Sequence, residues 1–377
     1  MIPLFKKFFR PKYTPLNRIE ILSQNILHNV SVLKKQQKQA EIVPVIKSNA
    51  YGHGIEEICS ILGKSAVKML AVDSFPEAQK VYKYSSKKVL LIGESALDCY
   101  EFFDVKRTEF CVYNIETFKK LASFKKNISV HLFINTGMNR EGIQDLEIFL
   151  ENTKEEQKHI NIIGVCSHLA SADSESDLNK EQEKIFFENV NILKSHNISP
   201  KYVHLGNSAG TFLLKNKKLN LFRTGISFYG YNPFPQDHPL FTKAQKLKPA
   251  LRVMSKIVSI QSLKKGEKVS YNETFRAKKN TKIAVIPFGY FEGLDRRLSN
   301  NFSVYIQGKE VKIAGRVCMN LTCLDIGNLD INIGDEVEIF SEKPEQKNSV
   351  QAMATQEKTI SYEVLVKLQG DLRREVI

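Results

Sequence analysis

The chain has 377 residues and 42% of them are hydrophobic, which is enough for two domains with sizeable cores. Its 55 Lys and Arg exceed its 41 Asp and Glu by a net charge of +14, but the lysines form scattered pairs and no basic block interleaved with aromatic residues. This distribution is typical of a solvated surface and argues against nucleic acid as a partner. The six cysteines show neither CxxC nor zinc-ligand spacing, so we predict no metal site and a reducing, cytoplasmic location.

Residues 1–15 are predicted to be an N-terminal extension. This segment is basic and aromatic, but no apolar stretch with a small-residue cleavage site follows it. It is also too short to cross a bilayer. We therefore expect no membrane partner.

Short apolar runs alternate with helical periodicity through residues 16–248. Such alternation predicts βαβ units and a parallel sheet. Eight units favour an α/β fold of the closed (β/α)8 TIM-barrel type. The main rival is an open doubly wound sheet, but no G-x-G-x-x-G follows the first strand. The predicted strands are 42–46, 68–72, 89–92, 109–112, 130–135, 162–167, 202–205 and 221–223, and the predicted helices are 55–62, 76–84, 117–124, 146–158 and 180–195.

The pattern changes near Pro249, where short β-rich runs separated by turns replace the alternation. We predict that residues 249–377 form a second, smaller and mostly β domain. Its predicted strands are 251–260, 282–287, 302–306, 311–314, 321–326 and 336–340, and one helix is predicted at 349–356.

The first barrel strand ends at Lys47, within V-I-K-S-N-A-Y-G-H-G at residues 45–54. A lysine at the end of a buried strand is poorly solvated, so its uncharged amine becomes available. Such an amine forms a Schiff base with an aldehyde, and pyridoxal phosphate is the common aldehyde cofactor. The motif therefore predicts a cofactor lysine.

Other polar residues follow later barrel strands, at the end where such barrels place their active sites. Arg140 follows strand five, His168 strand six, Asn207 and Ser208 strand seven, and Arg223, Gly225 and Ile226 strand eight. The loops after strands seven and eight commonly bind phosphate in this fold. A Ser hydroxyl and a Gly with exposed N–H groups are suited to that task. We expect these residues to converge on one rim of the barrel.

The whole motif at Lys47 resembles the cofactor-lysine motif of the alanine racemases, a family of fold-type III pyridoxal phosphate enzymes. Further matching segments span most of the chain: 136–140, 167–173, 204–209, 223–230, 269–271, 287–293, 315–319 and 359–364. The resemblance implies that Lys47 carries the cofactor and that its phosphate lies among Tyr51, Ser208, Gly225, Ile226 and Tyr362.

The same resemblance assigns the remaining roles. Arg223 would face the pyridine nitrogen, and His168 would lie near the ring and hydrogen-bond the second base, Tyr271. Arg140 and the backbone N–H of Met319 would hold the substrate carboxylate. Racemisation needs a base on each face of the α-carbon, which Lys47 and Tyr271 would supply. In the family the tyrosine comes from the partner subunit, which implies a homodimer with shared active sites.

Some positions depart from the family pattern. Phe133 stands where many members carry a lysine, often carbamylated, that orients the arginine equivalent to Arg140. Asn272 replaces a Gly after V-S-Y, and Asn is the next best tolerated residue at positive φ. We therefore expect activity independent of bicarbonate, with Arg140 held by other side chains or by an anion.

The sequence thus predicts an alanine racemase that acts on a small-molecule amino acid, with D-alanine supplied to peptidoglycan as a family-based expectation. A racemase of broader specificity, or one acting on serine or a basic amino acid, is the alternative. A decarboxylase on the same barrel is disfavoured by Tyr271 and Arg223. A non-catalytic cofactor-binding protein is disfavoured by the second domain, because such proteins have a single domain.

Overall fold

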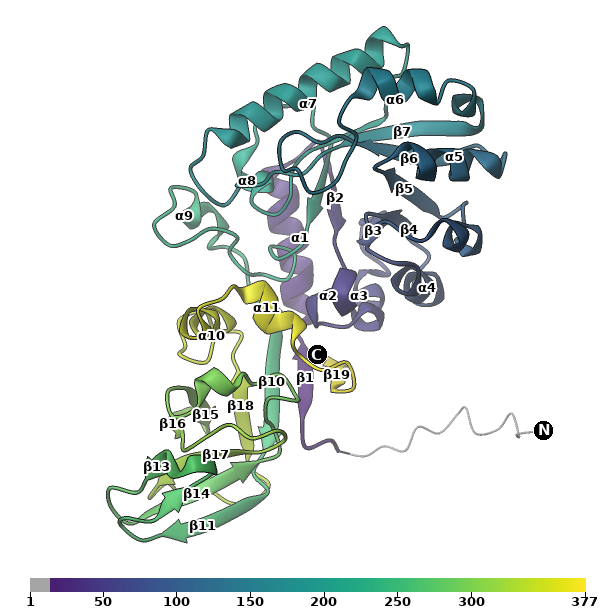
Figure 1. The fold of residues 1–377 in the computed structure, drawn as a ribbon. Coiled ribbons are helices and arrows are strands. Elements are labelled where there is room, and N and C mark those ends of the chain that lie inside the picture. Colours follow the sequence, from purple (N-terminus) through teal and green to yellow (C-terminus); the bar gives the residue numbers. More distant parts are fainter. Residues whose placement is uncertain (1–13) are drawn as a thin grey trace, which may run out of the picture. The chain divides into compact units, whose positions relative to one another are not determined.

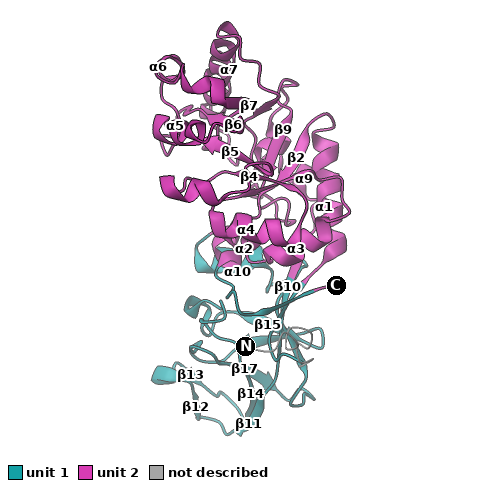
Figure 2. Ribbon diagram, turned by 90° about the vertical axis from the view of Figure 1, so that its right-hand side faces the viewer, with its two compact units in different colours: residues 1–20, 252–359, 367–375 teal, residues 21–251, 360–366, 376–377 magenta. Residues whose placement is uncertain are grey.

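A computed structural model describes residues 14–377, which form two compact units (Figure 2). The barrel unit comprises residues 21–251, 360–366 and 376–377. The β unit comprises, within the described part, residues 14–20, 252–359 and 367–375. The predicted N-terminal extension lies almost wholly in residues 1–13, outside the described residues.

Eight parallel strands form the barrel (Figure 1). Strands β3 to β8 form one sheet in chain order, and β2 pairs with β9. A bridge between Val45 and Ala71 links β2 to β3, and the Arg223 N–H donates to the Gly206 carbonyl at 3.0 Å, between β9 and the segment after β8. The sheet therefore closes on itself, and the predicted (β/α)8 barrel is confirmed. Its strands are β2 (Glu41–Pro44), β3 (Met69–Val72), β4 (Lys88–Leu91), β5 (Thr108–Val112), β6 (Ile128–Phe133), β7 (Ile160–Cys166), β8 (Tyr202–His204) and β9 (Leu221–Thr224).

The helices of the barrel unit begin at recognisable signals. Asn114 caps α5 by accepting from the Thr117 N–H, and Asp145 caps α6 by accepting from the Ile148 N–H. The predicted helix 146–158 is shorter, since it ends at Asn152 before Thr153, whose ψ of 13° and φ of −118° are not helical. The helices are α1 (Ser23–Gln36), α2 (Lys47–Tyr51), α3 (Ile55–Leu62), α4 (Phe75–Tyr84), α5 (Ile115–Ser123), α6 (Leu146–Asn152), α7 (Leu178–Ser195), α8 (Gly210–Leu213), α9 (Phe241–Ala244) and α11 (Ser361–Val366).

Side chains of alternate strand residues fill the barrel interior. Cys111, Phe133 and Cys166 belong to one buried cluster there. Glu109 lies two residues before Cys111 on its strand, and His131 lies two residues before Phe133. Both are also buried. Because side chains in a strand alternate between faces, these polar groups point to the same interior as the apolar cluster. The barrel core therefore contains a polar layer.

The β unit is built on a nine-stranded sheet in the order β11-β14-β17-β16-β15-β18-β10-β1-β19. The predicted strand 251–260 is two strands, β10 and β11, which pair with β18 and β14 respectively. The mostly β architecture is as predicted. The strands are β1 (Arg18–Ile21), β10 (Leu251–Lys256), β11 (Ser259–Leu263), β14 (Thr281–Ile286), β15 (Ser303–Ile306), β16 (Lys309–Ile313), β17 (Thr322–Gly327), β18 (Glu336–Phe340) and β19 (Arg373–Val376), with a small hairpin of β12 (Lys268–Val269) and β13 (Phe275–Arg276) and the helix α10 (Val350–Glu357).

Candidate active site

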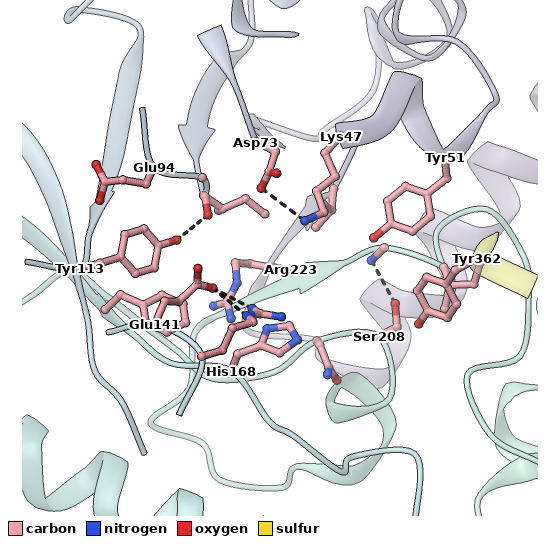
Figure 3. Close-up of a pocket in the computed structure, with 18 residues that line it drawn as sticks. Lys47, Tyr51, Asp73, Glu94, Tyr113, Glu141, His168, Ser208, Arg223 and Tyr362 are labelled. Carbon is pink, nitrogen blue, oxygen red and sulfur yellow. Dashed lines mark hydrogen bonds and ion pairs between the residues drawn. The ribbon is translucent and has the colours of Figure 1, made fainter. Parts of the chain in front are cut away.

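A cavity of about 530 Å³ opens at the carboxyl ends of the barrel strands. Its lining includes all the barrel residues for which the sequence predicted a role. Figure 3 shows Lys47 between two groups of side chains, with Tyr51, Tyr362 and Ser208 on one side and Tyr113 and Glu141 on the other. The predicted residues that line the cavity are Lys47, Tyr51, Arg140, His168, Asn207, Ser208, Arg223, Gly225, Ile226 and Tyr362.

Lys47 begins an unusual turn. The four residues from Ser48 to Tyr51 all have φ between 51° and 55°, in the left-handed region. For residues other than glycine this conformation costs about 1–2 kcal/mol each, and strained backbone of this kind occurs at functional sites. The Ser48 N–H donates to the Glu77 carboxylate at 2.6 Å, which helps to hold the turn. As a result the side chains of both Lys47 and Tyr51 reach the cavity.

The Lys47 amine has an acidic partner that the sequence reasoning missed. Its Nζ lies 3.3 Å from Oδ1 of Asp73, and the two side chains are 36% and 46% exposed. The lysine is therefore partly solvated and paired, which differs from the dry environment predicted for it. Asp73 directly follows β3, so the rule that placed the other cavity residues after barrel strands could have found it.

Hydroxyl groups and backbone N–H groups gather near Tyr51. Ser208 Oγ accepts from the N–H groups of Gly225 and Ser227 at 3.0 and 3.2 Å. A Cβ at Gly225 would lie 2.5 Å from the Tyr51 hydroxyl, so glycine lets that hydroxyl approach the backbone this closely. Burial raises the pKa of Tyr51, with Tyr362 and Asp73 adding to the effect, and burial also raises the pKa of Tyr362. Both phenols therefore stay protonated and can donate hydrogen bonds to an anion.

Arg223 is almost fully buried at the end of β9. Its Nη1 donates to Nδ1 of His204 at 2.6 Å. His204 Nε2 lies 2.8 Å from Nδ1 of His131, and His131 Nε2 lies 3.0 Å from Glu109 Oε2. Lys88 Nζ donates to the other Glu109 oxygen at 2.7 Å. We call Glu109, His131, His204 and Arg223 the polar relay.

The direction of the polar relay is fixed by its ends. A guanidinium only donates and a carboxylate only accepts, so each histidine must accept at Nδ1 and donate at Nε2. Burial lowers the pKa of both His131 and His204, which keeps the rings neutral as this pattern requires. For Glu109, burial opposes ionisation, but hydrogen bonds from His131 and Lys88 outweigh it and its pKa lies below the ordinary value. The relay therefore anchors Arg223 with a single set of tautomers.

His168 and Arg140 occupy the remaining wall of the cavity. Burial and, after it, the charges of Arg223, Arg140 and Lys47 in that order together lower the pKa of His168 to about 3. The imidazole is therefore neutral at pH 7. Arg140 donates from Nε and Nη2 to one oxygen of Glu141, at 3.1 and 2.7 Å. Asn207 lines the cavity, and its amide joins two loops: Oδ1 accepts from the Gly210 N–H at 2.9 Å and Nδ2 donates to the Leu169 carbonyl at 3.4 Å.

The other two predicted site residues, Tyr271 and Met319, lie in the β unit. Tyr271 is 66% exposed and Met319 is 56% exposed. Tyr271 is the first residue of a short 3-10 turn. Its two neighbours, Ser270 and Asn272, both have positive φ, at 64° and 56°. The structure thus presents the phenol and the methionine on the surface of their own unit.

Within residues 14–377 no helix is long and apolar enough to cross a membrane. No group of three or more His, Cys, Asp or Glu side chains in the same range could hold a metal ion. All six cysteines, each within the described part of the chain, are free thiols.

Comparison with known proteins gives one family for both parts of the chain. The family described as "Alanine racemase, N-terminal domain" matches residues 21–233, and "Alanine racemase, C-terminal domain" matches residues 250–376. The alanine racemase of Borreliella burgdorferi is 34% identical over 360 residues, which cover 91% of this chain and 92% of that one. A solved alanine racemase from Clostridium difficile superposes with a TM-score of 0.89 at 29% identity and covers 97% of both chains. The Bacillus anthracis alanine racemase with bound L-Ala-P has a TM-score of 0.87 at 28% identity, covering 97% of this chain and 96% of that one.

Proposed function

The chain belongs to the alanine racemase family, and we propose that it is a pyridoxal phosphate enzyme that interconverts L-alanine and D-alanine. The observation that carries the proposal is the cavity, where an amine, a buried guanidinium, a neutral imidazole and a cluster of hydroxyl groups meet at the end of a barrel. No single residue of this set would identify the chemistry. The proposal is supported by the convergence of all of them in a chain of this family.

The cavity residues fit the cofactor. Protonated Tyr51 and Tyr362 hydroxyls, the Ser208 hydroxyl and the backbone at Gly225, which carries no side chain, suit a phosphate group. The Lys47 amine suits the aldehyde of the same molecule. Buried Arg223 suits the pyridine nitrogen as a donor, since a guanidinium does not give up its proton. We therefore propose that these residues, with His168, Asn207 and Ile226, hold pyridoxal phosphate.

When bound, pyridoxal phosphate makes the α-proton of an amino acid acidic enough to be removed near neutral pH. Lys47 would take or return that proton on one face of the α-carbon. Tyr271 would do the same on the other face, where His168 can accept a hydrogen bond from it because the imidazole is neutral. Arg140 and the Met319 N–H would bind the carboxylate. Arg223, which keeps its proton, would limit electron withdrawal at the ring nitrogen and so disfavour transamination.

We further propose a homodimer with shared active sites. Tyr271 and Met319 are exposed on the β unit, so both are available to a second copy of the chain. A two-fold axis would let each β unit complete the cavity of its partner's barrel. Each site would then combine Lys47 of one chain with Tyr271 of the other.

The location and biological use of the product are also proposals. The free state of all six described cysteines supports the cytoplasm, where thiols stay reduced. Membership of the family supports a supply of D-alanine for peptidoglycan. Growth of a deletion strain that depends on added D-alanine would test this use, and growth without it would contradict it.

Chiral chromatography tests the reaction itself. The holoenzyme is incubated separately with L-alanine, L-serine, L-lysine and L-arginine, and the enantiomers are resolved over time. We expect L-alanine to approach an equal mixture of enantiomers faster than the other substrates. Faster conversion of serine or a basic amino acid would make the chain a racemase of different specificity. Absence of any racemisation by holoenzyme with bound cofactor would refute the proposal.

A further inference from the structure

The position of Arg140 raises a question about this chain in particular. Under the proposed function its guanidinium binds the substrate carboxylate, so its orientation matters for substrate affinity. In many family members a carbamylated lysine provides the negative charge that orients this arginine. Here Phe133 occupies that position, so the charge must come from elsewhere.

Phe133 itself leaves no room for a charged group at its own site. Its ring lies 4.8 Å from the ring of Tyr113, centroid to centroid, and its side chain belongs to the buried barrel cluster. Gly142 also lies against the ring, since a Cβ added to it would be only 3.1 Å from Cδ1 of Phe133. The space beside β6 is therefore filled by an apolar ring.

Backbone pairing then folds the following loop back onto β6. The Ile143 N–H donates to the Phe133 carbonyl at 2.8 Å, and the Asn135 N–H donates to the Ile143 carbonyl at 3.0 Å. This pairing returns the chain to Phe133 just after Glu141. Glu141, Phe133, Tyr113 and Arg140 all line the cavity, and Figure 3 labels Glu141 and Tyr113 on the same side of it.

The Glu141 carboxylate faces both the arginine and the region around Phe133. One of its oxygens accepts from Nε and Nη2 of Arg140, at 3.1 and 2.7 Å. Its negative charge also contributes to the raised pKa of the Cys111 and Tyr113 side chains, after larger contributions from the Cys111–Cys166 contact and from burial. The carboxylate lies in the same cavity wall as Tyr113 and Phe133.

We propose that Glu141 is the positioning residue for Arg140 and supplies the negative charge that a carbamylated lysine provides in other family members. Phe133 and Glu141 then form a linked pair, in which the ring fills the space of the lysine chain and the carboxylate replaces its charge. Glu141 does not touch the reacting atoms and acts only through Arg140. The inference rests on the proposed function for the identity of the substrate, but the ion pair can be tested without turnover.

The first test compares Glu141→Gln with the matched control Glu155→Gln in the holoenzyme. Glu155 is also an acid paired with a base, 3.0 Å from Lys158, and both of those side chains are well exposed. We expect Glu141→Gln to raise the KM for L-alanine and the Kd for propionate by roughly three- to tenfold, with kcat changed by less than about twofold, because a partly exposed ion pair orients a binding group. Propionate binding is measured by calorimetry. Values equal to those of the Glu155→Gln control would overturn the proposal.

The second test restores the negative charge near Arg140 with a lysine in place of Phe133 that can be carbamylated. In Glu141→Gln/Phe133→Lys, bicarbonate should return the KM and the propionate Kd toward the wild-type values, while buffer free of carbon dioxide should not. With ¹³C-bicarbonate, a carbamate signal should appear in the NMR spectrum of this variant alone. If a carbamate forms and affinity does not recover, Arg140 is not oriented by charge at this place. If the double variant does not fold, the single variant still decides.

These measurements test the role of Glu141 and the proposed function separately. If the wild type racemises alanine and Glu141→Gln behaves like the control, only the role of Glu141 fails. If propionate binding weakens in Glu141→Gln but the wild type racemises no alanine, the ion pair stands and the proposed function fails.

Discussion

Replacing Glu109 by Leu tests the polar relay inside the barrel. The Glu109 and His131 side chains are 2% and 0% exposed, so loss of the carboxylate leaves the His131 Nε2–H buried without an acceptor. If His131 changes tautomer instead, its Nδ1–H faces His204, and His204 must then present an N–H to the Arg223 guanidinium, 2.6 Å away. The first outcome loses the charge-assisted hydrogen bond to the carboxylate. The second places two hydrogen-bond donors, of His204 and Arg223, against each other.

The expected cost follows from burial. Leaving a buried hydrogen-bond donor without its acceptor costs about 1–3 kcal/mol, and we take about 3 kcal/mol because the lost acceptor is a carboxylate. For a unit of this size that lowers the melting temperature by roughly 6–12 °C. Calorimetry of Glu109→Leu against Lys88→Gln provides the assay, since Lys88 is 51% exposed and its removal should cost under about 1 kcal/mol. Equal melting temperatures for the two variants would refute the single-direction relay.

Two other predictions concern pH and assembly. Burial lowers the folded-state pKa of His131 and His204, so the unfolded chain binds more protons below about pH 6.5. The free energy of unfolding should therefore fall as the pH drops through that value, by up to about 1.4 kcal/mol per pH unit for each histidine. Urea denaturation that gives the same free energy of unfolding at pH 5.5 and pH 7.5 would contradict this. Lys47→Ala and Tyr271→Ala homodimers should each be nearly inactive, while unfolding and refolding them together should restore about a quarter of the wild-type sites, because about half the dimers are mixed and each has one intact site. Mixed dimers shown to form without recovered activity would exclude shared sites.

Much of the barrel was predictable because each strand is a local apolar run and each helix a local periodic one. The helix α3 has the predicted bounds, Ile55–Leu62, since glycines precede and follow it. Once the strand ends are known, the barrel rule predicts which polar residues approach one another, and Arg140, His168 and Arg223 line the same cavity.

Other features depend on contacts that local patterns do not encode. The left-handed turn from Ser48 to Tyr51 runs against the preferences of its residues and is held by Glu77 from another segment. The pairing of Lys47 with Asp73 joins the ends of two strands, and no spacing rule states which acid meets which base. Tyr362 follows all but one of the strands of the β unit in sequence, yet its helix α11 belongs to the barrel unit.

The polar relay shows the same limit. Glu109 and His131 lie within strands whose other residues are mainly apolar, and either one alone would be interpreted as an exposed position. Parallel pairing of β5 with β6 sets Cys111 beside His131 and so brings Glu109 within reach of the imidazole. Only the closed barrel makes that a buried hydrogen bond.

The central claim is that Lys47 binds the cofactor in the barrel cavity, and reduction of the holoenzyme tests it most directly. Borohydride makes the link between lysine and cofactor permanent, and peptide mass mapping then locates the pyridoxyl group. We predict a single adduct on Lys47, and loss of both the adduct and the visible absorbance of bound cofactor in Lys47→Ala. A pyridoxyl group on any other lysine of the wild-type chain would contradict the account.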